Sequence, residues 1–404
     1  MVEMIKIYEN TGMNIFADIK DDNVDFIAKG MFGPIVNPVV NLMMRYFKDE
    51  RPLIATDDSL IFSTWIPPMP SKAFDRLVGN QIKMKITRRH IPEEVSVAVT
   101  GKCPCDCVFC CAKGIVAEPE LTLDEMKDLI DQAIEAGAYL LVFDGGETLL
   151  RKDIYDIIGY VDDRAITVMF TNGLYLTKEV ARKLKDAGLY SLQVSIDSPY
   201  QEDHDRIRGI PGIFEKATAG AKAAVEAGLL VSMYYVARPE NSDEKTLNNL
   251  VELAGEIGAH EVSIYDILAI GKWLEHEDET MSEADRRRTV ALHKRVNSPG
   301  KQGPKVMAFS YFEGPELYGC LAGRRWMHVT PAGDVIPCSY TPLTFGNIRE
   351  EPLVDIWKKI RSHPAYKKDG LPCMVQNKDF REKYIYKIPK DGRIPYPISN
   401  FNVK

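Results

Sequence analysis

The stretch "VSVAVTGKCPCDCVFCCAKG", residues 95–114, joins an apolar run to a dense group of cysteines. The run "VSVAVTG" is typical of a β-strand, because it is rich in valine and ends in glycine. Five of the chain's eight cysteines follow between residues 103 and 111. In a long cytosolic chain, clustered thiols more often bind metal or do redox work than form disulfides. The stretch therefore predicts a metal or redox site at the end of a strand.

The sequence after residue 94 alternates between apolar runs and amphipathic segments. Further strands are predicted at residues 139–147, 165–173, 191–197, 229–238 and 261–271. Helices are predicted between most of them, at residues 121–138, 153–163, 177–188, 211–228 and 243–259. Such alternation predicts a parallel sheet buried on both faces. The expected fold is α/β, a partial (β/α)6 TIM-like barrel with its active site at the carboxyl ends of the strands.

Those strand ends carry polar and glycine-rich motifs. The cysteines follow the first strand, "DGGE" (144–147) ends the second, "TNG" (171–173) the third and "SID" (195–197) the fourth. Parallel strands bring such ends to one rim, which predicts a shared site there. The alternative for each glycine is that it only makes a turn.

The spacing of Cys103, Cys107 and Cys110 is Cys-x3-Cys-x2-Cys. Three closely spaced thiolates can hold three irons of a 4Fe–4S cluster and leave the fourth iron open to a small molecule. A zinc site would need a nearby fourth cysteine or histidine, and residues 111–120 contain no histidine. We interpret the remaining thiols, Cys105 and Cys111, as bystanders.

The cysteine spacing, with Phe109 before the last cysteine, resembles the signature of the radical S-adenosylmethionine (SAM) superfamily. "DGGE" and "SID" strengthen the resemblance, which spans about residues 94 to 300. It implies an enzyme that binds SAM at the open iron and reductively cleaves it to methionine and a 5′-deoxyadenosyl radical. That radical would abstract a hydrogen from an unactivated carbon of the substrate. A low-potential electron donor such as ferredoxin or flavodoxin is also implied.

The resemblance further implies a SAM pocket at the rim of the barrel. Its candidate residues are Phe109, Gly145, Gly146, Glu147, Asn172, Ser195, Asp197, Arg206 and Arg208. The Gly-Gly-Glu motif would receive the SAM amino group, and the serine and aspartate of "SID" would contact the ribose and carboxylate. Arg208 of "HDRIRG" would grip the SAM carboxylate, with Arg206 as its rival. Phe109 would lie by the adenine, and Asn172 is either a pocket residue or a turn residue.

The C-terminal part has a second, weaker resemblance. "CLAGRRWMHVTPAGDVIPC", residues 320–338, predicts a β-hairpin between two cysteines and resembles the opening of SPASM modules. Only Cys373 follows, so the chain departs from full SPASM modules, which carry many more cysteines. This suggests a twitch-like half module in which Cys320, Cys338 and Cys373 hold one auxiliary 4Fe–4S cluster. The alternative is three ordinary buried thiols.

We expect three parts: an N-terminal α+β extension (1–92), the barrel (93–300) and the SPASM/twitch-like module with a tail (301–404). In the extension, residues 30–47 form an apolar stretch in which Asn37 and Pro38 predict a helix start. The stretch is too interrupted for a membrane span. It either packs as a helix on the barrel or belongs to a surface for a hydrophobic substrate.

The substrate is less well defined by the sequence. The apolar stretch favours a hydrophobic or amphiphilic substrate, such as a lipid, isoprenoid, tetrapyrrole or cofactor precursor. The alternative is a maturase that modifies a ribosomally made peptide or protein. A more distant alternative is a non-catalytic iron–sulfur electron carrier, which would not need the rim motifs. Trp273, Trp326, His328 and Tyr340 are candidates for the substrate pocket.

Composition sets the remaining expectations. The net charge of −7 argues against general nucleic-acid binding. The first residues, "MVEMIKIYEN", contain no apolar run of the kind found in signal peptides. We therefore expect a cytoplasmic protein, with peripheral membrane contact as a further option.

Overall fold

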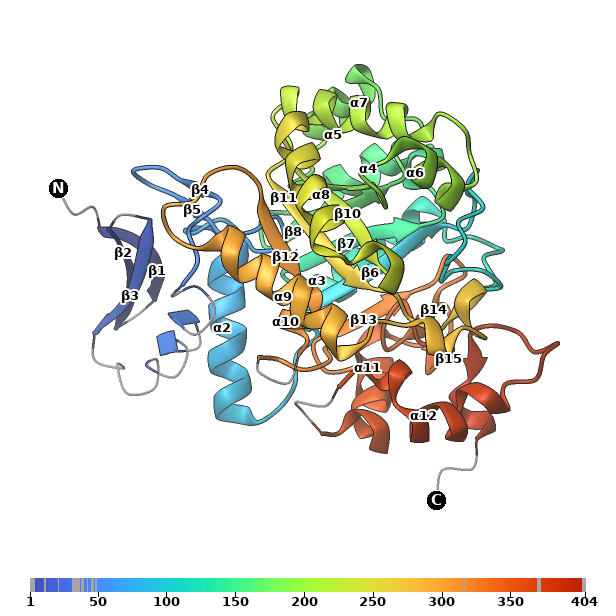
Figure 1. Ribbon diagram of the computed structural model, residues 1–404. Coiled ribbons are helices and arrows are strands. Elements are labelled where there is room, and N and C mark those ends of the chain that lie inside the picture. Colours follow the sequence, from blue (N-terminus) through green and yellow to red (C-terminus); the bar gives the residue numbers. More distant parts are fainter. Residues whose placement is uncertain are drawn as a thin grey trace.

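The computed structural model describes residues 4–10, 12–20, 22–30, 49–314, 317–368 and 372–401, together with residues 37, 40, 41, 43, 44 and 47. A ten-stranded sheet forms the centre of the molecule (Figure 1). Its main strands are β6 (Glu94–Thr100), β7 (Leu140–Gly145), β8 (Ile166–Thr171), β9 (Ser191–Ser195), β10 (Leu230–Ala237), β11 (Glu261–Asp266) and β12 (Lys305–Ala308). These seven lie side by side in sequence order and pair in parallel. The structure thus confirms the predicted parallel α/β sheet.

The seventh parallel strand, β12, lies past residue 300 and was not predicted. It has only four residues, "KVMA", and begins with a lysine, so it gives no clear strand pattern. The Lys305 side chain is nevertheless fully buried, because acceptors from residues 50–62 surround its ammonium group. The division of the chain near residues 92 and 300 remains a prediction.

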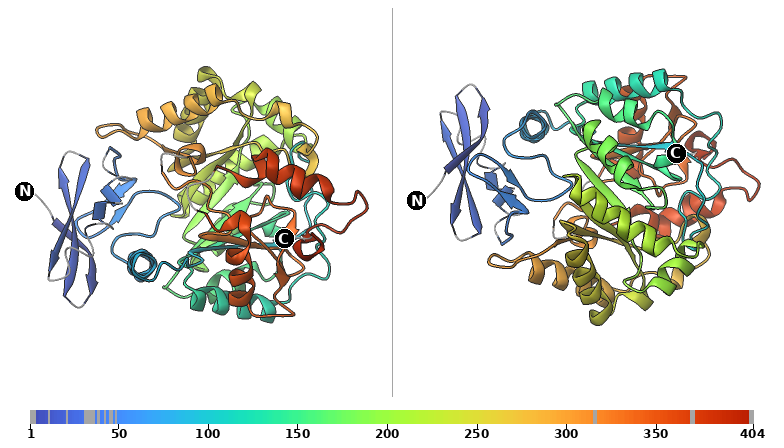
Figure 2. Two further views of the ribbon diagram at one scale, coloured as in Figure 1. Left: turned by 90° about the horizontal axis from the view of Figure 1, so that it is seen from below. Right: turned by 90° about the horizontal axis from the view of Figure 1, so that it is seen from above.

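Amphipathic helices cover the outer side of the curved sheet (Figure 2). They are α3 (Leu123–Ala136), α4 (Ile154–Tyr160), α5 (Lys178–Asp186), α6 (Gln201–Arg208), α7 (Ile213–Glu226), α8 (Glu244–Ile257) and α9 (Glu283–Asn297). In α3 the Thr122 side chain accepts from the Glu125 amide while the Glu125 carboxylate accepts from the Thr122 amide. This capping box begins the helix, and Gly137 at positive φ ends it. Its buried face packs into the main hydrophobic core.

The C-terminal part extends the same sheet from the edge of β6. The strand β13 (Trp326–Val329) pairs in parallel with β6 and antiparallel with β14 (Asp334–Ile336), which confirms the predicted hairpin. The remaining elements are α10 (Phe309–Phe312), β15 (Leu343–Thr344), β16 (Gly346–Asn347), α11 (Leu353–Ser362), α12 (Lys378–Lys383) and β17 (Tyr396–Pro397). The C-terminal module and the barrel therefore share one continuous sheet.

The N-terminal part has its own sheet at one end of the molecule (Figures 1 and 2). Its elements are β1 (Met4–Asn10), β2 (Met13–Lys20) and β3 (Asn23–Gly30), all antiparallel, then β4 (Ile54–Ala55), β5 (Leu60–Ile61) and α2 (Lys72–Thr87). Of the predicted helix start, Asn37 is helical and exposed, whereas Pro38, like much of the stretch 30–47, lies outside the described residues. Within that stretch Val40, Met43 and Phe47 are buried in a hydrophobic cluster with the N-terminal sheet, which favours packing over a substrate surface. No helix of the described residues is long and apolar enough to cross a membrane.

Candidate active site

A cavity of about 470 Å³ opens inside the barrel, and all six predicted strands contribute to its wall. The inward-facing residues of β6 line it along the whole strand: Glu94, Ser96, Ala98 and Thr100. The outward-facing valines of the same strand pack into the hydrophobic core. The cavity therefore runs from the rim at the carboxyl ends of the strands toward their amino ends. The two ends differ in chemistry.

The rim end carries the cysteine loop, residues 101–114. All five of its thiol groups line the cavity. The Cys105 thiol hydrogen-bonds to those of Cys103 and Cys107, which raises the pKa of Cys105 and lowers the pKa of both neighbours, that of Cys107 to about 6. Arg208 also donates to Cys107 Sγ at 3.5 Å. The three predicted ligands, Cys103, Cys107 and Cys110, thus share one wall next to a cation, and this donor set fits an iron–sulfur cluster.

Cys105 contacts the predicted ligands directly, which a bystander thiol need not do. Its Sγ is 3.3 Å from Asn172 Nδ2, which is 4.0 Å from Cys103 Sγ. Asn172 therefore contacts the cysteine loop directly and lines the cavity. The assignment of Cys105 and Cys111 as bystanders remains a prediction.

The two glycines of "DGGE" allow the end of β7 to approach the start of the cysteine loop. A Cβ atom on Gly145 would lie 2.4 Å from the Thr100 carbonyl oxygen, and one on Gly146 would lie 2.2 Å from that of Lys102. Both glycines line the cavity. Both positions require glycine because of this close contact, whether or not they also receive the SAM amino group.

Glu147 is fully buried behind the rim. Its carboxylate accepts hydrogen bonds from the Thr171 hydroxyl at 2.7 Å and from the amides of Leu149 and Asn172 at 3.0 and 2.7 Å. Burial raises the pKa of Glu147, and these hydrogen bonds act against that shift. The side chain therefore joins the ends of β7 and β8. Its contact with the SAM amino group remains a prediction.

Arg208 connects "SID" to the cysteine loop. Its Nε donates at 2.5 Å to Asp197, which is fully buried, and Arg208 and Ser195 both line the cavity. Arg206 is placed differently: its side chain is 65% exposed and pairs with Asp203 on α6. This position does not suit the predicted SAM contact, because neighbouring helical residues point to different sides. Phe109 lines the cavity with its ring 5.9 Å from the Arg208 guanidinium carbon.

The deep end of the cavity is aromatic. Its rings come from the N-terminal part, the barrel and the C-terminal module: Trp65, Phe170, Tyr234, Tyr265, Phe309, Trp326 and Tyr340. Tyr265 and Phe309 stack with centroids 3.6 Å apart. Trp326 Nε1 donates to Ser96 Oγ at 2.7 Å, and Ser96 is 2.8 Å from His328 Nδ1. Three of the four predicted pocket residues thus line the cavity, while Trp273 stacks on His276 elsewhere.

Five carboxyl groups also line the cavity, of which Asp106 and Asp266 pair with Lys272 and Arg286. Sequence reasoning did not assign the other three, Glu94, Asp144 and Glu313, to a pocket. Burial, with Asp144 nearby, raises the pKa of Glu94 to about 8. Burial raises the pKa of Asp144 to about 7 and that of Glu313 well above its usual range. We call these three residues the acidic group. Only Asp144 has a visible signal in the sequence, because it belongs to "DGGE". Glu94 and Glu313 belong to no motif.

The cations of the cavity wall belong to the rim: Arg208 and Lys272 contact the cysteine loop, and Lys113 is part of that loop. Arg208 pairs with Asp197, and Lys272 pairs with Asp106 in the cysteine loop. His328 lies 3.8 Å from Asp144, but burial lowers the pKa of His328 to about 3 and so keeps it neutral. The substrate end of the cavity therefore offers carboxyl groups and aromatic rings.

A second cysteine site forms where Cys320, Cys338 and Cys373 come together; we call it the auxiliary site. The thiols of Cys320 and Cys373 hydrogen-bond, and the amides of Met374 and Ala322 also point at Cys320. The Cys373 hydrogen bond, with these amides, lowers the pKa of Cys320 to about 6 against the effect of burial. Cys338 Sγ lies 3.1 Å from the Thr341 hydroxyl, and burial raises the pKa of Cys338 to about 12. The charges of Cys320 and Cys338 both act on Cys373, so three thiols distant in sequence lie near one another, and this donor set fits a cluster-binding site.

Comparisons with known proteins agree with this geometry. The radical SAM superfamily model matches residues 97–251, and the SPASM iron–sulfur cluster-binding domain model matches residues 320–386. An AdoMet-dependent heme synthase of Methanosarcina barkeri is 33% identical over 297 residues, which cover 68% of this chain and 84% of the relative. A PqqA peptide cyclase of Granulibacter bethesdensis is 28% identical over 310 residues, covering 72% and 80%. The crystal structure of Streptococcus suis SuiB bound to precursor peptide SuiA superposes with a TM-score of 0.57 at 16% identity, covering 90% of each chain.

The chain belongs to the radical SAM superfamily. It is a radical SAM enzyme of the SPASM/twitch subgroup, which makes the alternative of a non-catalytic carrier wrong. Its cofactors are a 4Fe–4S cluster and SAM, and its C-terminal domain is of a kind that binds an auxiliary iron–sulfur cluster. The individual ligands and SAM contacts remain predictions.

Proposed function

We propose that this enzyme modifies a residue within a peptide or protein, and that Cys103, Cys107 and Cys110 hold its SAM-binding cluster. The acidic and aromatic end of the cavity is the observation that carries the choice of substrate. Peptide amides and amine or guanidinium side chains pair well with carboxyl groups and stack on aromatic rings. The expected hydrophobic or amphiphilic substrate fits this wall less well.

The relatives also support a peptide. The curated PqqA peptide cyclase acts on a peptide, as its name states, and SuiB was solved with its precursor peptide. The match to SuiB covers 90% of this chain, more than residues 93–404 alone could supply. It therefore extends into the N-terminal part.

A tetrapyrrole is the second candidate, because the heme synthase relative is the more similar at 33% identity. Heme and its porphyrin precursors carry carboxylate side chains. The same burial that raises the pKa of Glu94 and Asp144 would oppose further carboxylates at this wall, because burial disfavours the ionised form of a carboxyl group. The second candidate therefore ranks below the first.

The chain's own residues would divide the work along the cavity. When bound, the cluster and SAM supply a radical that takes a hydrogen atom from the substrate. Arg208, held by Asp197, would orient the SAM carboxylate through a bidentate contact. The aromatic wall would exclude water from the reacting carbon. Glu94, protonated near neutral pH, would donate a hydrogen bond from its carboxyl group to a substrate carbonyl.

The test is an anaerobic assay with two substrates in parallel. Reconstituted protein, dithionite and SAM are incubated with synthetic peptides from open reading frames next to the gene, or with iron coproporphyrin III. We expect 5′-deoxyadenosine to increase with one peptide, whose mass changes at a single residue. The Cys107→Ala variant should give neither product. Decarboxylation of the porphyrin without any peptide change would overturn the proposal in favour of the second candidate.

A further inference from the structure

Arg324 is a buried cation with unused donors. It lies between Cys320 and β13 and is only 3% exposed. One amino group, Nη1, donates to the Cys320 carbonyl oxygen at 2.7 Å. Within the described residues, its Nε and Nη2 are buried and have no hydrogen-bond acceptor. A guanidinium keeps its charge at any pH that a folded protein tolerates, so this group is both charged and unsatisfied.

Two other buried arginines, Arg208 and Arg381, are compensated by carboxylates. Arg208 pairs with Asp197, and Arg381 pairs with Glu277 and donates to several backbone carbonyls. An uncompensated buried charge is strongly unfavourable, because its lost hydration is not replaced. The surroundings of Arg324 therefore call for an anion that the described residues do not supply.

The auxiliary site lies next to Arg324. The charge of Arg324 is among the influences that favour the Cys320 thiolate, and Cys320 contacts Cys373. A cluster bound by these thiolates would bring negative charge and sulfur acceptors to this place. The potential of such a cluster depends on its net charge and on hydrogen bonds to its sulfurs. A cluster at the auxiliary site would therefore supply the anion that Arg324 lacks among the described residues.

We propose that Arg324 is the counter-ion of the auxiliary cluster and donates from Nε and Nη2 to its sulfur atoms. The inference rests on the proposed ligands Cys320, Cys338 and Cys373. Positive charge and hydrogen bonds stabilise the reduced form, which carries one more negative charge. Arg324 thus raises the reduction potential of the auxiliary cluster and helps it to accept an electron. It is a positioning residue, because it acts through the cluster.

The test is a redox titration of full-length reconstituted protein, followed by electron paramagnetic resonance. The signal that changes when SAM is added belongs to the SAM-binding cluster, and the insensitive signal reports the auxiliary one. We expect Arg324→Met to lower the ratio of reduced to oxidised auxiliary cluster about tenfold at a fixed potential, or about 59 mV for one electron. Arg324→Lys should restore part of the shift. Arg325→Met, which removes a charge paired with Glu93 in the same turn, should change the potential much less.

The possible outcomes separate the inference from its basis. A wild-type protein with only about four irons would contradict the auxiliary ligands, since two clusters need about eight. An Arg324→Met protein with about eight irons and an unchanged potential would overturn the role of Arg324 alone. If Arg324→Met loses the auxiliary irons while Arg324→Lys keeps them, the need for a positive charge is supported. Loss in both variants would contradict it.

Discussion

At the scale of single residues, Glu94 shows how the cavity changes ordinary chemistry. It begins β6 and faces the cavity, while the next residue, Val95, is fully buried in the core. Burial, with Asp144 nearby, raises the pKa of Glu94 from 4.5 to about 8. The folded protein therefore keeps a proton that the unfolded chain has already released at neutral pH.

This difference predicts a pH dependence of stability. Between pH 4.5 and about 8 the folded state binds more protons than the unfolded state, so the free energy of unfolding falls as the pH rises. Glu94→Gln removes this contribution. We expect the melting temperature of the wild type to fall more steeply between pH 5 and pH 8 than that of the variant. Thermal melts followed by circular dichroism measure both curves, with Glu202→Gln on the exposed face of α6 as the control. Parallel curves for wild type and Glu94→Gln would contradict the prediction.

The rim residues were largely visible in the sequence, whereas the carboxyl groups Glu94 and Glu313 of the deep end were not. "DGGE", "TNG" and "SID" each end a strand, so their positions follow from the alternation of elements alone. Glu313 cannot be recognised in this way, because it belongs to a segment after α10 that only the tertiary fold brings to the cavity. Arg206 and Arg208 also look equivalent in sequence. Only the orientation of α6 separates the exposed residue from the buried one.

At the scale of elements, the strands from β6 to β11 were predictable because each is an apolar run between two amphipathic helices. The strand β12 was not, because a buried lysine contradicts the pattern of a core strand. Lys305 is stabilised by partners from residues 50–62, which are more than 240 positions earlier in the chain. No local pattern can reveal such a contact. The N-terminal sheet was likewise not assigned before the structure.

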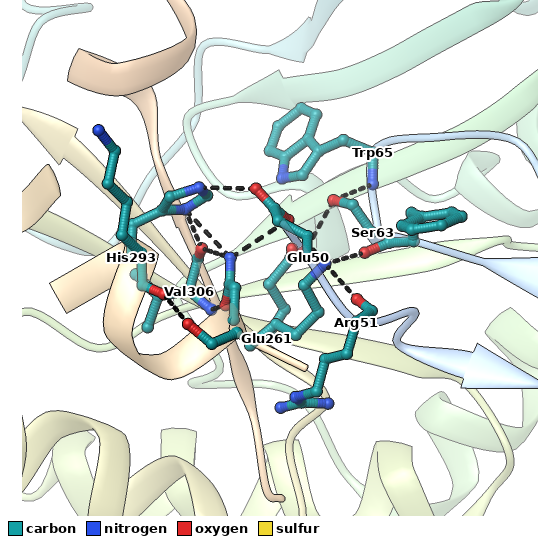
Figure 3. Close-up of polar contacts among 12 residues, drawn as sticks. Glu50, Arg51, Ser63, Trp65, Glu261, His293 and Val306 are labelled. Atoms are coloured by element: carbon teal, nitrogen blue, oxygen red, sulfur yellow. Dashed lines mark hydrogen bonds and ion pairs between the residues drawn. The ribbon is translucent and has the colours of Figure 1, made fainter. Parts of the chain in front are cut away.

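These partners form a buried polar network that joins residues 50–64 to the barrel (Figure 3). The Lys305 ammonium contacts Glu50 and the carbonyls of Arg51 and Phe62, all at 2.9 Å. His293 of α9 contacts Glu50 at 2.8 Å. Although burial acts to raise it, Lys305 and His293 lower the pKa of Glu50 to about 2. Nearby, the Glu261 carboxylate of β11 accepts from Ser63 and Thr64.

This network predicts a large effect of Lys305→Met. The substitution leaves Glu50 buried without its main counter-charge, which costs about 3–5 kcal/mol in comparable buried pairs. We expect a loss of this size in the free energy of unfolding, measured with urea. The Glu50→Gln/Lys305→Met double variant should recover part of it, because no charge then remains unpaired.

Hydrogen exchange locates the effect. Lys305→Met should expose the amides of residues 50–65 to faster exchange while those of β7 and β8 stay protected. Lys178→Met, on the exposed surface of α5, serves as the control. A single variant as stable as the wild type would show that the network contributes little.

At the scale of the whole molecule, the two cysteine sites lie on one sheet. The strand β6 leads into the cysteine loop, and its neighbour β13 begins the hairpin that ends at Cys338. Residues of the C-terminal module, including Trp326, His328 and Tyr340, line the same cavity as the cysteine loop. A substrate in the cavity would thus contact walls that belong to both modules. We therefore expect the auxiliary site to affect the substrate step rather than the cleavage of SAM.

This arrangement predicts that the two activities separate. The Cys320→Ala/Cys338→Ala double variant should keep about four irons, since the cysteine loop is untouched. It should still cleave SAM to 5′-deoxyadenosine at a reduced rate but form no modified substrate. Iron analysis and chromatography of the deoxyadenosine measure both quantities. Cys111→Ser serves as the control, because it removes a thiol that lines the cavity and is not a predicted ligand, and it should keep all irons and activities. Full product formation by the double variant would contradict a role of the auxiliary site in turnover, because the substrate step would then need only the SAM-binding cluster.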